Sequence, residues 1–412
     1  SAYVDLQAAA YVFLAFYSWE NGCKRNQSSW FLLMTLFAGA AVATKLTTVI
    51  ILPLAFLGLA LHGRTHKNEK QTAQQCLMLV LGSLIILSPW LARNYFFTGN
   101  PVAPFFMSFF GGDAGMNWDA TRSQMQFQYY SSFGMGHGIL DFLSLPINLT
   151  FFSELHSLKF DGKIGIFYLL LLPALFSLQR KSLPVVIVFA VLLIFWFMQT
   201  QYIRLLAPAF AFLSILLVSG LKQTFQKTGI GKKEKIFLTF ILALGILFNT
   251  SIITKEWFRI NPLSYLINKE NREQFLTRQI KAYPSYVDAN NMLGEEDKVM
   301  LVYMRNLGYL MDRPFISDTF FEAHTLTEMI DKGVYAADIA NRLKTRGITH
   351  IMFDFNFVFG KDSALTMGER AVLKNFLNLH GKQLSAKNGF LLYRFVLDSK
   401  SGKQTLSIPF NH

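Results

Sequence analysis

The chain divides into two regions by its pattern of hydrophobic and polar residues. Residues 1–254 consist of long apolar runs separated by short polar stretches, whereas residues 255–412 read as ordinary globular sequence. An apolar helix needs about 20 residues to cross the hydrocarbon core of a bilayer. Eight runs reach this length when their flanks are included: 6–19, 30–43, 47–61, 77–91, 164–178, 183–198, 202–221 and 236–254. The pattern predicts a polytopic α-helical membrane protein with about eight spans.

The apolar stretch at residues 30–61 is too long for one span. Lys45 lies near its middle, and a lysine in the hydrocarbon core is costly. We therefore expect two short spans with a turn at Lys45.

The basic residues of the short connections predict the orientation of the spans. They form four groups: Lys24 and Arg25; Arg64, Lys67 and Lys70; Arg180 and Lys181; and Lys222, Lys227, Lys232, Lys233 and Lys235. With eight spans all four groups fall on one side of the membrane, which the positive-inside rule makes cytoplasmic. The extracytoplasmic side then receives Asp5, the Lys45 turn, residues 93–163 and the C-terminal region 255–412.

Composition agrees with a membrane protein and changes the interpretation of the net charge. Hydrophobic residues make up 52% of the chain and charged residues 16%, against about 25% charged in soluble domains. The net charge of +13 is explained by the basic connections, so we expect no nucleic-acid partner. Cys23 and Cys76 fall in or beside cytoplasmic connections and are expected to be reduced thiols.

The connection at residues 93–163 is longer than a passive loop and rich in aromatic residues. Aromatic residues mixed with polar ones suit amphipathic helices that lie in the membrane interface. Two interpretations remain open: a cap on the membrane surface without chemistry, or one wall of a cavity that opens to the lipid.

The C-terminal region 255–412 has the alternation of a small soluble α/β domain. Strands are expected at 298–304, 349–353 and 389–395, and helices at 336–346 and 369–380. The region contains no glycine-rich phosphate loop and no cluster of metal ligands in its sequence. His350 and Asp354 flank an expected strand, and we interpret both as structural residues.

Four charged residues at the expected extracytoplasmic ends of spans are candidates for chemistry: Asp5, Lys45, Arg93 and Arg204. Ionisable residues at membrane depth are expensive and often functional. Each also has a simpler explanation, because Asp5 suits the first turn of a helix and the cations suit interfacial anchors. One carboxylate and three cations on one membrane face would suit a lipid-linked phosphate beside a base.

Four stretches resemble a known family: 3–10 (YVDLQAAA), 39–52 (GAAVATKLTTVIIL), 88–104 (SPWLARNYFFTGNPVAP) and 201–208 (QYIRLLAP). They are similar to the membrane-helix aspartate, the Thr-Lys turn, the Pro-Trp to Gly-Asn-Pro stretch and the Arg-Tyr-Leu-Leu-Pro element of GT-C glycosyltransferases. These polytopic enzymes use polyprenyl-phosphate sugars, and they include protein O-mannosyltransferases and aminoarabinose transferases of lipid A. Residues 201–208 depart from the family element in one respect: they read Tyr-Ile-Arg where the family has Arg-Tyr.

The resemblance implies sugar transfer from a polyprenyl-phosphate donor to a glycan, lipid or protein acceptor outside a bacterial inner membrane. It implies acid–base or metal-related work for Asp5 and donor-phosphate contact for Lys45, Arg93 and Arg204. A carboxylate can act as general base on an acceptor hydroxyl, and cations stabilise a phosphate leaving group. A divalent metal is compatible with such a site, although the sequence does not identify its ligands.

The family's other acidic motif follows its first helix, and no matching segment precedes Asp5. We therefore expect an N-terminal truncation and an inactive fragment. Two other functions stay open: a lipid-linked oligosaccharide polymerase, ligase or flippase, and a non-enzymatic membrane protein whose soluble domain binds a partner.

Overall fold

A computed structural model describes residues 4–66, 68–103, 105–110, 120–226, 231–317, 323–331, 336–361, 363 and 365–396. Two residues of the basic connections, Lys67 and Lys227, lie outside this set. The chain divides into two compact units, Ser1–Glu256 and Trp257–His412. The division lies close to the change in sequence pattern after residue 254.

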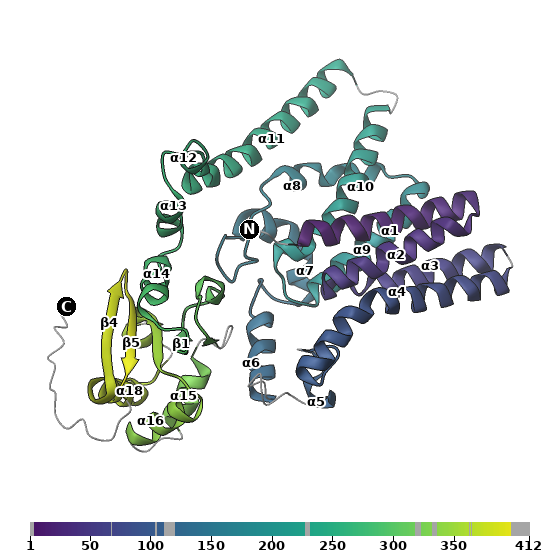
Figure 1. The fold of residues 1–412 in the computed structure, drawn as a ribbon. Coiled ribbons are helices and arrows are strands. Elements are labelled where there is room, and N and C mark those ends of the chain that lie inside the picture. Colours follow the sequence, from purple (N-terminus) through teal and green to yellow (C-terminus); the bar gives the residue numbers. More distant parts are fainter. Residues whose placement is uncertain are drawn as a thin grey trace. The chain divides into compact units, whose positions relative to one another are not determined.

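The first unit is helical (Figure 1). It opens with two helical hairpins, in which α1 packs on α2 and α3 packs on α4. Its helices are α1 (Asp5–Arg25), α2 (Ser28–Thr44), α3 (Ile51–His66), α4 (Glu69–Thr98), α5 (Met107–Phe110), α6 (Ala120–Ser131), α7 (Ile139–Ile147), α8 (Phe167–Leu171), α9 (Leu183–Phe197), α10 (Ala207–Gln226) and α11 (Lys232–Ile260). Short 3-10 segments η1 (Leu46–Thr48), η4 (Leu172–Ser177), η5 (Arg180–Ser182) and η6 (Ile203–Leu206) extend several of them.

Five helical stretches in the described residues are long and apolar enough to cross a membrane: Leu46–Thr65, Glu69–Thr98, Arg180–Phe197, Ile203–Gln226 and Lys232–Ile260. These lengths and compositions are those of an integral membrane protein. Every one of the eight expected runs is at least partly helical. The other three runs lie in helices that are not both long and apolar enough. Ser28–Thr44 and Phe167–Ser177 are shorter apolar helices, and α1 is more polar, with Glu20, Lys24 and Arg25 in its last turns.

The break expected at Lys45 is confirmed by the helix boundaries. α2 ends at Thr44, Lys45 adopts an extended conformation with φ −157° and ψ 117°, and α3 begins at Ile51 after the η1 turn. The Lys45 carbonyl oxygen accepts hydrogen bonds from the Thr48 backbone N–H and from Thr48 Oγ1. The chain therefore reverses direction between two apolar helices at this lysine.

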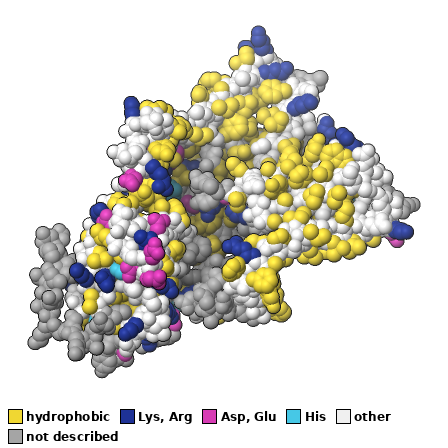
Figure 2. Space-filling model, in the orientation of Figure 1, with side chains coloured by type: hydrophobic (Ala, Val, Ile, Leu, Met, Phe, Trp, Pro, Cys, Tyr) yellow, Lys and Arg dark blue, Asp and Glu magenta, His cyan; other side chains and the backbone are white. Residues whose placement is uncertain are grey.

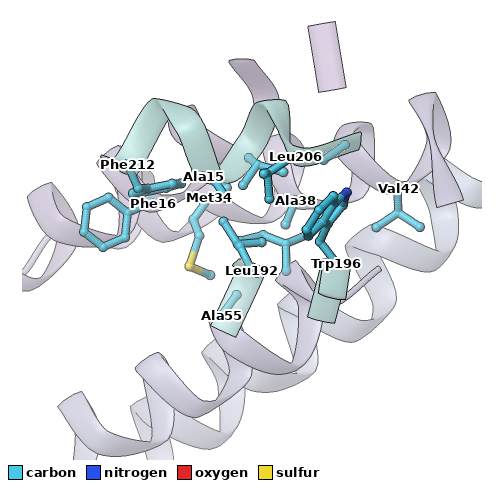
Figure 3. Close-up of a cluster of buried hydrophobic side chains, with 14 of the residues drawn as sticks. Ala15, Phe16, Met34, Ala38, Val42, Ala55, Leu192, Trp196, Leu206 and Phe212 are labelled. Carbon is cyan, nitrogen blue, oxygen red and sulfur yellow. The ribbon is translucent and has the colours of Figure 1, made fainter. Parts of the chain in front are cut away.

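The core of the first unit lies where α1, α2, α3, α9, η6 and α10 meet. Figure 3 shows side chains from all of these elements in one cluster, including Phe16, Met34, Trp196, Leu206 and Phe212. Met34 and Phe212 are fully buried, and Phe16 and Phe212 meet edge to face with ring centroids 5.2 Å apart. This packing joins the helical elements whose ends carry Asp5, Lys45 and Arg204.

The second unit is a small α/β domain. Its helices are α12 (Pro262–Leu266), α13 (Arg272–Gln279), α14 (Tyr283–Met292), α15 (His324–Asp331), α16 (Ala336–Thr345), α17 (Phe355–Phe359) and α18 (Met367–His380). Its strands are β1 (Val299–Val302), β2 (Phe315–Ser317), β3 (His350–Asp354), β4 (Gly381–Lys387) and β5 (Phe390–Phe395), in the sheet order β2-β1-β3-β5-β4. β2, β1 and β3 are parallel, whereas β5 and β4 are antiparallel to their neighbours.

The three strands and two helices expected from the sequence are present as β1, β3, β5, α16 and α18. The short edge strand β2 and the polar strand β4 were not expected. His350 and Asp354 both have structural partners. Asp354 caps α17 through the backbone N–H groups of Asn356 and Phe357, and His350 Nδ1 lies 2.7 Å from Thr349 Oγ1.

Candidate functional site

Asp5 and Lys45 form a partly buried ion pair between Asp5 Oδ1 and Lys45 Nζ. The Asp5 side chain is 7% exposed and the Lys45 side chain is 24% exposed. Taking a carboxylate and an ammonium out of water is expensive unless the two charges compensate each other. The pair therefore accounts for the burial of both charges.

Helix geometry explains why residues 40 positions apart meet. The turn at Asn26, which has a left-handed φ of 49°, folds α2 back along α1, so that the start of α1 lies near the end of α2. Asp5 occupies the first turn of α1 and Lys45 follows the last residue of α2. The helix dipoles favour an anion at the first position and a cation at the second.

The second carboxylate oxygen of Asp5 is buried and has no hydrogen-bond partner among the described residues. A buried carboxylate oxygen without a donor costs about 1–3 kcal/mol or more. Oδ2 is therefore an acceptor to which a ligand hydroxyl could donate while Lys45 holds Oδ1.

Arg204 lies in η6 at the start of the α10 span, among aromatic side chains. Its guanidinium carbon is 4.6 Å from the centroid of the Tyr202 ring. Its charge also acts on Tyr130 of α6. Burial raises the pKa of Tyr130, and a hydrogen bond with Gln126 and the Arg204 charge oppose that rise. The segment 93–163 thus contributes a side chain to the surroundings of Arg204.

Gln201 connects the same segment to the start of η6, and the sequence analysis did not single it out. Gln201 is 1% exposed. Its Nε2 donates to the Gly136 carbonyl oxygen at 2.7 Å, and its Oε1 accepts from the Met135 backbone N–H at 3.3 Å. Gly134 has a φ of 109°, and a Cβ there would lie 1.9 Å from Gln201 Oε1. The signal in the sequence was a polar residue directly before the Tyr-Ile-Arg element.

Arg93 lies apart from these contacts. It is exposed on α4, which continues five residues beyond it to Thr98, and its guanidinium carbon lies 5.9 Å from the Phe97 ring centroid. The buried polar residue of this motif is Asn100, which is 0% exposed. Asn100 Nδ2 donates to the Phe105 carbonyl oxygen at 2.8 Å, and Oδ1 accepts from the Val102 N–H at 3.0 Å. Asn100 therefore holds the turn after α4.

A small pocket lies beside the Lys45 turn, lined among others by Thr47, Thr48, Trp196, Gln199 and Leu205. It brings the Thr-Lys turn next to the element that carries Arg204. Its volume of about 20 Å³ is enough for roughly one water molecule. A sugar phosphate does not fit in this conformation, so binding would require the pocket to open.

The described residues contain no group of three or more His, Cys, Asp or Glu side chains placed to hold a metal ion. In the described part of the chain, Asp5 pairs with a cation and belongs to no cluster of carboxylates. The residues that the structure describes do not by themselves form a metal site.

A family model described as "Domain of unknown function (DUF8201)" matches residues 1–211. The chain belongs to this family, whose match covers the Asp5–Lys45 pair, Arg93 and Arg204. No curated protein matches the chain.

Solved structures with a similar course of the chain include GT-C glycosyltransferases. ArnT from Cupriavidus metallidurans bound to undecaprenyl phosphate aligns at 14% identity with a TM-score of 0.46, covering 97% of this chain and 76% of that one. Its apo form aligns at 14% identity with a TM-score of 0.49, covering 97% of this chain and 75% of that one. The apo oligosaccharyltransferase from Archaeoglobus fulgidus aligns at 13% identity with a TM-score of 0.36, covering 91% of this chain and 54% of that one. Scores below 0.5 at these identities do not define a reaction.

Proposed function

We propose that this protein is a membrane glycosyltransferase that moves a sugar from a polyprenyl-phosphate donor to an acceptor outside the membrane. The observation that carries the proposal is the partly buried Asp5–Lys45 pair at the ends of two apolar helices. The four stretches that resemble GT-C enzymes support it, because both members of the pair lie within them.

In the proposed reaction, Asp5 is the catalytic residue. Oδ2 accepts the proton of the acceptor hydroxyl as the hydroxyl oxygen attacks the anomeric carbon of the donor sugar. The bond between that carbon and the phosphate oxygen breaks, and its electron pair leaves with the polyprenyl phosphate. General base catalysis of this kind contributes typically ~10²–10⁴-fold to a rate.

Lys45 has two roles in this proposal: its ion pair holds the Asp5 carboxylate in place, and its ammonium group faces the departing phosphate. Arg204 supplies a second cation from the η6 turn, held by Tyr202 and the Gln201 contacts. Arg93 is proposed to act farther out, where its exposed guanidinium meets a lipid phosphate at the membrane surface.

The test uses undecaprenyl phosphate as the probe and the purified chain in detergent. Lys45→Gln should weaken binding by about 10-fold or more, because a hydrogen bond to a charged group is worth ~1.5–3 kcal/mol. Lys24→Gln is the matched control. Lys24 is an exposed lysine at the other end of α1, paired with Glu20 at 2.6 Å. Native mass spectrometry measures the bound lipid.

Asp5→Asn separates binding from chemistry. It should leave undecaprenyl phosphate bound and remove sugar transfer, measured with labelled donor lipid in membranes of a strain that makes the protein. Equal binding by Lys45→Gln and Lys24→Gln, or unchanged transfer by Asp5→Asn in a correctly inserted protein, would refute the proposal.

The orientation belongs to the same proposal. We propose that the basic connections are cytoplasmic, that the membrane is a bacterial inner membrane and that the C-terminal unit is extracytoplasmic. A reporter at Lys232 should be cytoplasmic and one at Gly360 outside. The reverse result would move Asp5 and Lys45 to the cytoplasmic side. It would favour an enzyme that uses a soluble cytoplasmic donor.

A further inference from the structure

The helix α7, continued by the π-helical turn η3 (Asn148–Phe152), has both a buried apolar face and an exposed one. Leu145 and Leu149 are each 4% exposed and belong to the core of the first unit. On another side of α7 the apolar side chains are uncovered. Those that are more than half exposed are Ile139, Leu140, Leu143 and Ile147. Residues three or four positions apart lie on the same side of a helix, so the exposed apolar face is continuous.

A third face of the same helix is polar. Asp141, Ser144 and Asn148 follow the i, i+3, i+7 pattern of one side of a helix. Their side chains form hydrogen bonds along that side. Asp141 Oδ2 accepts from the Gly138 backbone N–H at 2.9 Å. Ser144 Oγ donates to the Asp141 carbonyl oxygen at 3.1 Å and accepts from Asn148 Nδ2 at 2.9 Å. The helix therefore has one face for the protein core, one for water and one for an apolar medium.

The position of α7 is set by its contact with the end of a candidate span. The ring of Phe142 meets the ring of Phe197 edge to face, with centroids 5.1 Å apart. Phe197 is the last residue of the apolar stretch Arg180–Phe197, and the next such stretch begins at Ile203. The connection between two spans lies at the boundary between hydrocarbon and water. We therefore place α7 at that boundary.

Both ends of the segment are tied to the same connection. Before α7, the Gly136 carbonyl oxygen accepts from Gln201 Nε2 at 2.7 Å. After η3, the Phe160 carbonyl oxygen accepts from the Ile203 backbone N–H at 2.9 Å. The helix and the turn have nine and five residues, fewer than the roughly 20 that a crossing needs. The segment thus leaves one level of the membrane and returns to it without crossing.

The charges of the segment do not attract it to anionic lipid. Between Gly138 and Leu158 the chain has two acidic residues, Asp141 and Glu154, and neither Lys nor Arg. Helices that bind anionic surfaces carry basic residues on the polar face. The exposed apolar area is therefore the feature of this segment that favours a membrane.

We propose that α7 and η3 form a membrane-surface helix whose exposed apolar face is inserted among the acyl chains of one leaflet. The polar face of Asp141, Ser144 and Asn148 then meets the headgroups and water. The partner is the bilayer itself, without a requirement for headgroup charge. Because both ends of the segment are tied to the connection between two spans, the depth of α7 fixes the depth of that connection. The inference does not depend on the proposed sugar transfer.

The experiment measures the depth of single spin labels in the full chain, after Cys23→Ser and Cys76→Ser. Labels at Ile139→Cys and Ile147→Cys report on the two ends of the apolar face. The chain is reconstituted at one copy in each disc of phosphatidylcholine. Collisions with oxygen, which concentrates among acyl chains, and with a water-soluble nickel chelate give the depth. We expect equal depths below the phosphates at both positions. A helix that enters the membrane end-on would instead separate them by about 12 Å.

The opposite side and the lipid charge supply the contrasts. A label at Asn148→Cys should collide with the nickel chelate. Anionic phosphatidylglycerol or added salt should leave all depths unchanged, because the segment has no basic side chain to respond to them.

A serine on the apolar face tests the insertion itself. Ile147→Ser, detected by a label at Leu143→Cys, should lower the ratio of lipid-embedded to water-exposed label by about 10-fold or more. This is the effect of losing one aliphatic side chain from an apolar medium. Ile253→Ser is the matched control, because Ile253 is an isoleucine of α11 that is also more than half exposed. It should leave the ratio unchanged.

Three results would overturn the proposal. The first is a depth that changes steadily from Ile139 to Ile147, which would mean that the segment enters the bilayer end-on. The second is collision with the nickel chelate but not with oxygen at both positions, which would place the face in water. The third is protection from both reagents, which would mean that protein covers the face. Dipolar broadening in discs with two copies would then identify a second chain as the cover.

Discussion

The two units use hydrophobic side chains in opposite ways. In α11 only 6% of the apolar window is buried within the protein, and Phe240, Leu247 and Phe258 are all more than half exposed. In β1 all four residues from Val299 to Val302 are buried. Figure 2 shows hydrophobic side chains spread over the helical surface, while acidic side chains gather on the C-terminal unit.

The difference shows that the hydrophobic residues of this chain are placed for two different solvents, water and lipid. In water, burying apolar area drives folding of the C-terminal unit. In lipid there is no such driving force between helices, so an exposed leucine on α11 costs nothing. Polar contacts and close packing of small residues then hold the helices together. Gly220 is an example, because a Cβ there would lie 2.1 Å from the Ala174 carbonyl oxygen.

The largest expected effect comes from the same substitution in both units. Phe353→Ala in β3 removes a fully buried ring and should destabilise the C-terminal unit by about 3–5 kcal/mol. Phe240→Ala in α11, where the ring is 59% exposed, should change stability by less than about 0.5 kcal/mol. Pulse proteolysis of the full chain in urea and detergent measures both. Similar losses for the two variants would mean that α11 is buried against protein.

Introducing a charge should have the opposite outcome, with the larger effect in α11 and the smaller one in the C-terminal unit. Leu247→Arg, near the middle of α11, should disfavour insertion by about 2.5–3.5 kcal/mol. Leu379→Arg, on an exposed position of α18, should stay within about ±0.5 kcal/mol. Glycosylation mapping of α11 and protease resistance of α18 give the two readouts. Full insertion of the Leu247→Arg chain would argue against a lipid-facing helix.

The Asp5–Lys45 pair places a buried carboxylate of the membrane unit beside a partly exposed cation. Lys45→Met leaves the Asp5 carboxylate buried without its cation, which should cost about 2–3 kcal/mol because Lys45 is partly exposed. Adding Asp5→Asn should recover at least half of that loss, since the remaining amide carries no charge. Thermal unfolding in detergent provides the double-mutant cycle. Additive losses would show that the two side chains do not interact.

The smallest effect is a pH dependence confined to the C-terminal unit. Burial lowers the pKa of His350, the nearby Asp297 opposes this, and Arg394 adds to it. His350 therefore stabilises the fold fully above about pH 6.5, and this contribution is lost as the pH falls from there through the folded pKa. His350→Gln should reduce this pH-dependent loss of unfolding free energy, which is about 1.4 kcal/mol for each unit by which the pKa is lowered.

A second acidic step is expected from Asp288. Burial opposes its ionisation, but hydrogen bonds from Lys387 and Ser385 together with the Lys387 charge outweigh burial and lower the Asp288 pKa. Its contribution is present above the ordinary carboxyl pKa of 3.8 and is lost at lower pH. Asp288→Asn should remove this step and leave the His350 step in place. Protease resistance of the C-terminal unit against pH measures both steps.

Much of the fold followed from local pattern. The helical runs, the break at Lys45, the three strands β1, β3 and β5 and the change of pattern near residue 254 are all properties of neighbouring residues. The shorter spans were harder to predict because they do not reach spanning length by themselves. For example, α2 has only 17 residues. At a rise of ~1.5 Å for each residue this is less than a hydrocarbon core of about 30 Å. β4 is mostly exposed, so it lacks the hydrophobic alternation that identifies a strand.

The sequence alone determined which residues are candidates for chemistry, because a charge in an apolar run is visible without a structure. Tertiary structure decided which of them meet. Asp5 and Lys45 are brought together by a helical hairpin, Arg204 lies near Tyr130 of a segment about 70 residues earlier, and Arg93 remains on an exposed helix face. The physical reason is that periodicity specifies one face of one helix at a time. Contact between elements depends instead on helix lengths, turns and packing, which are set by the whole chain.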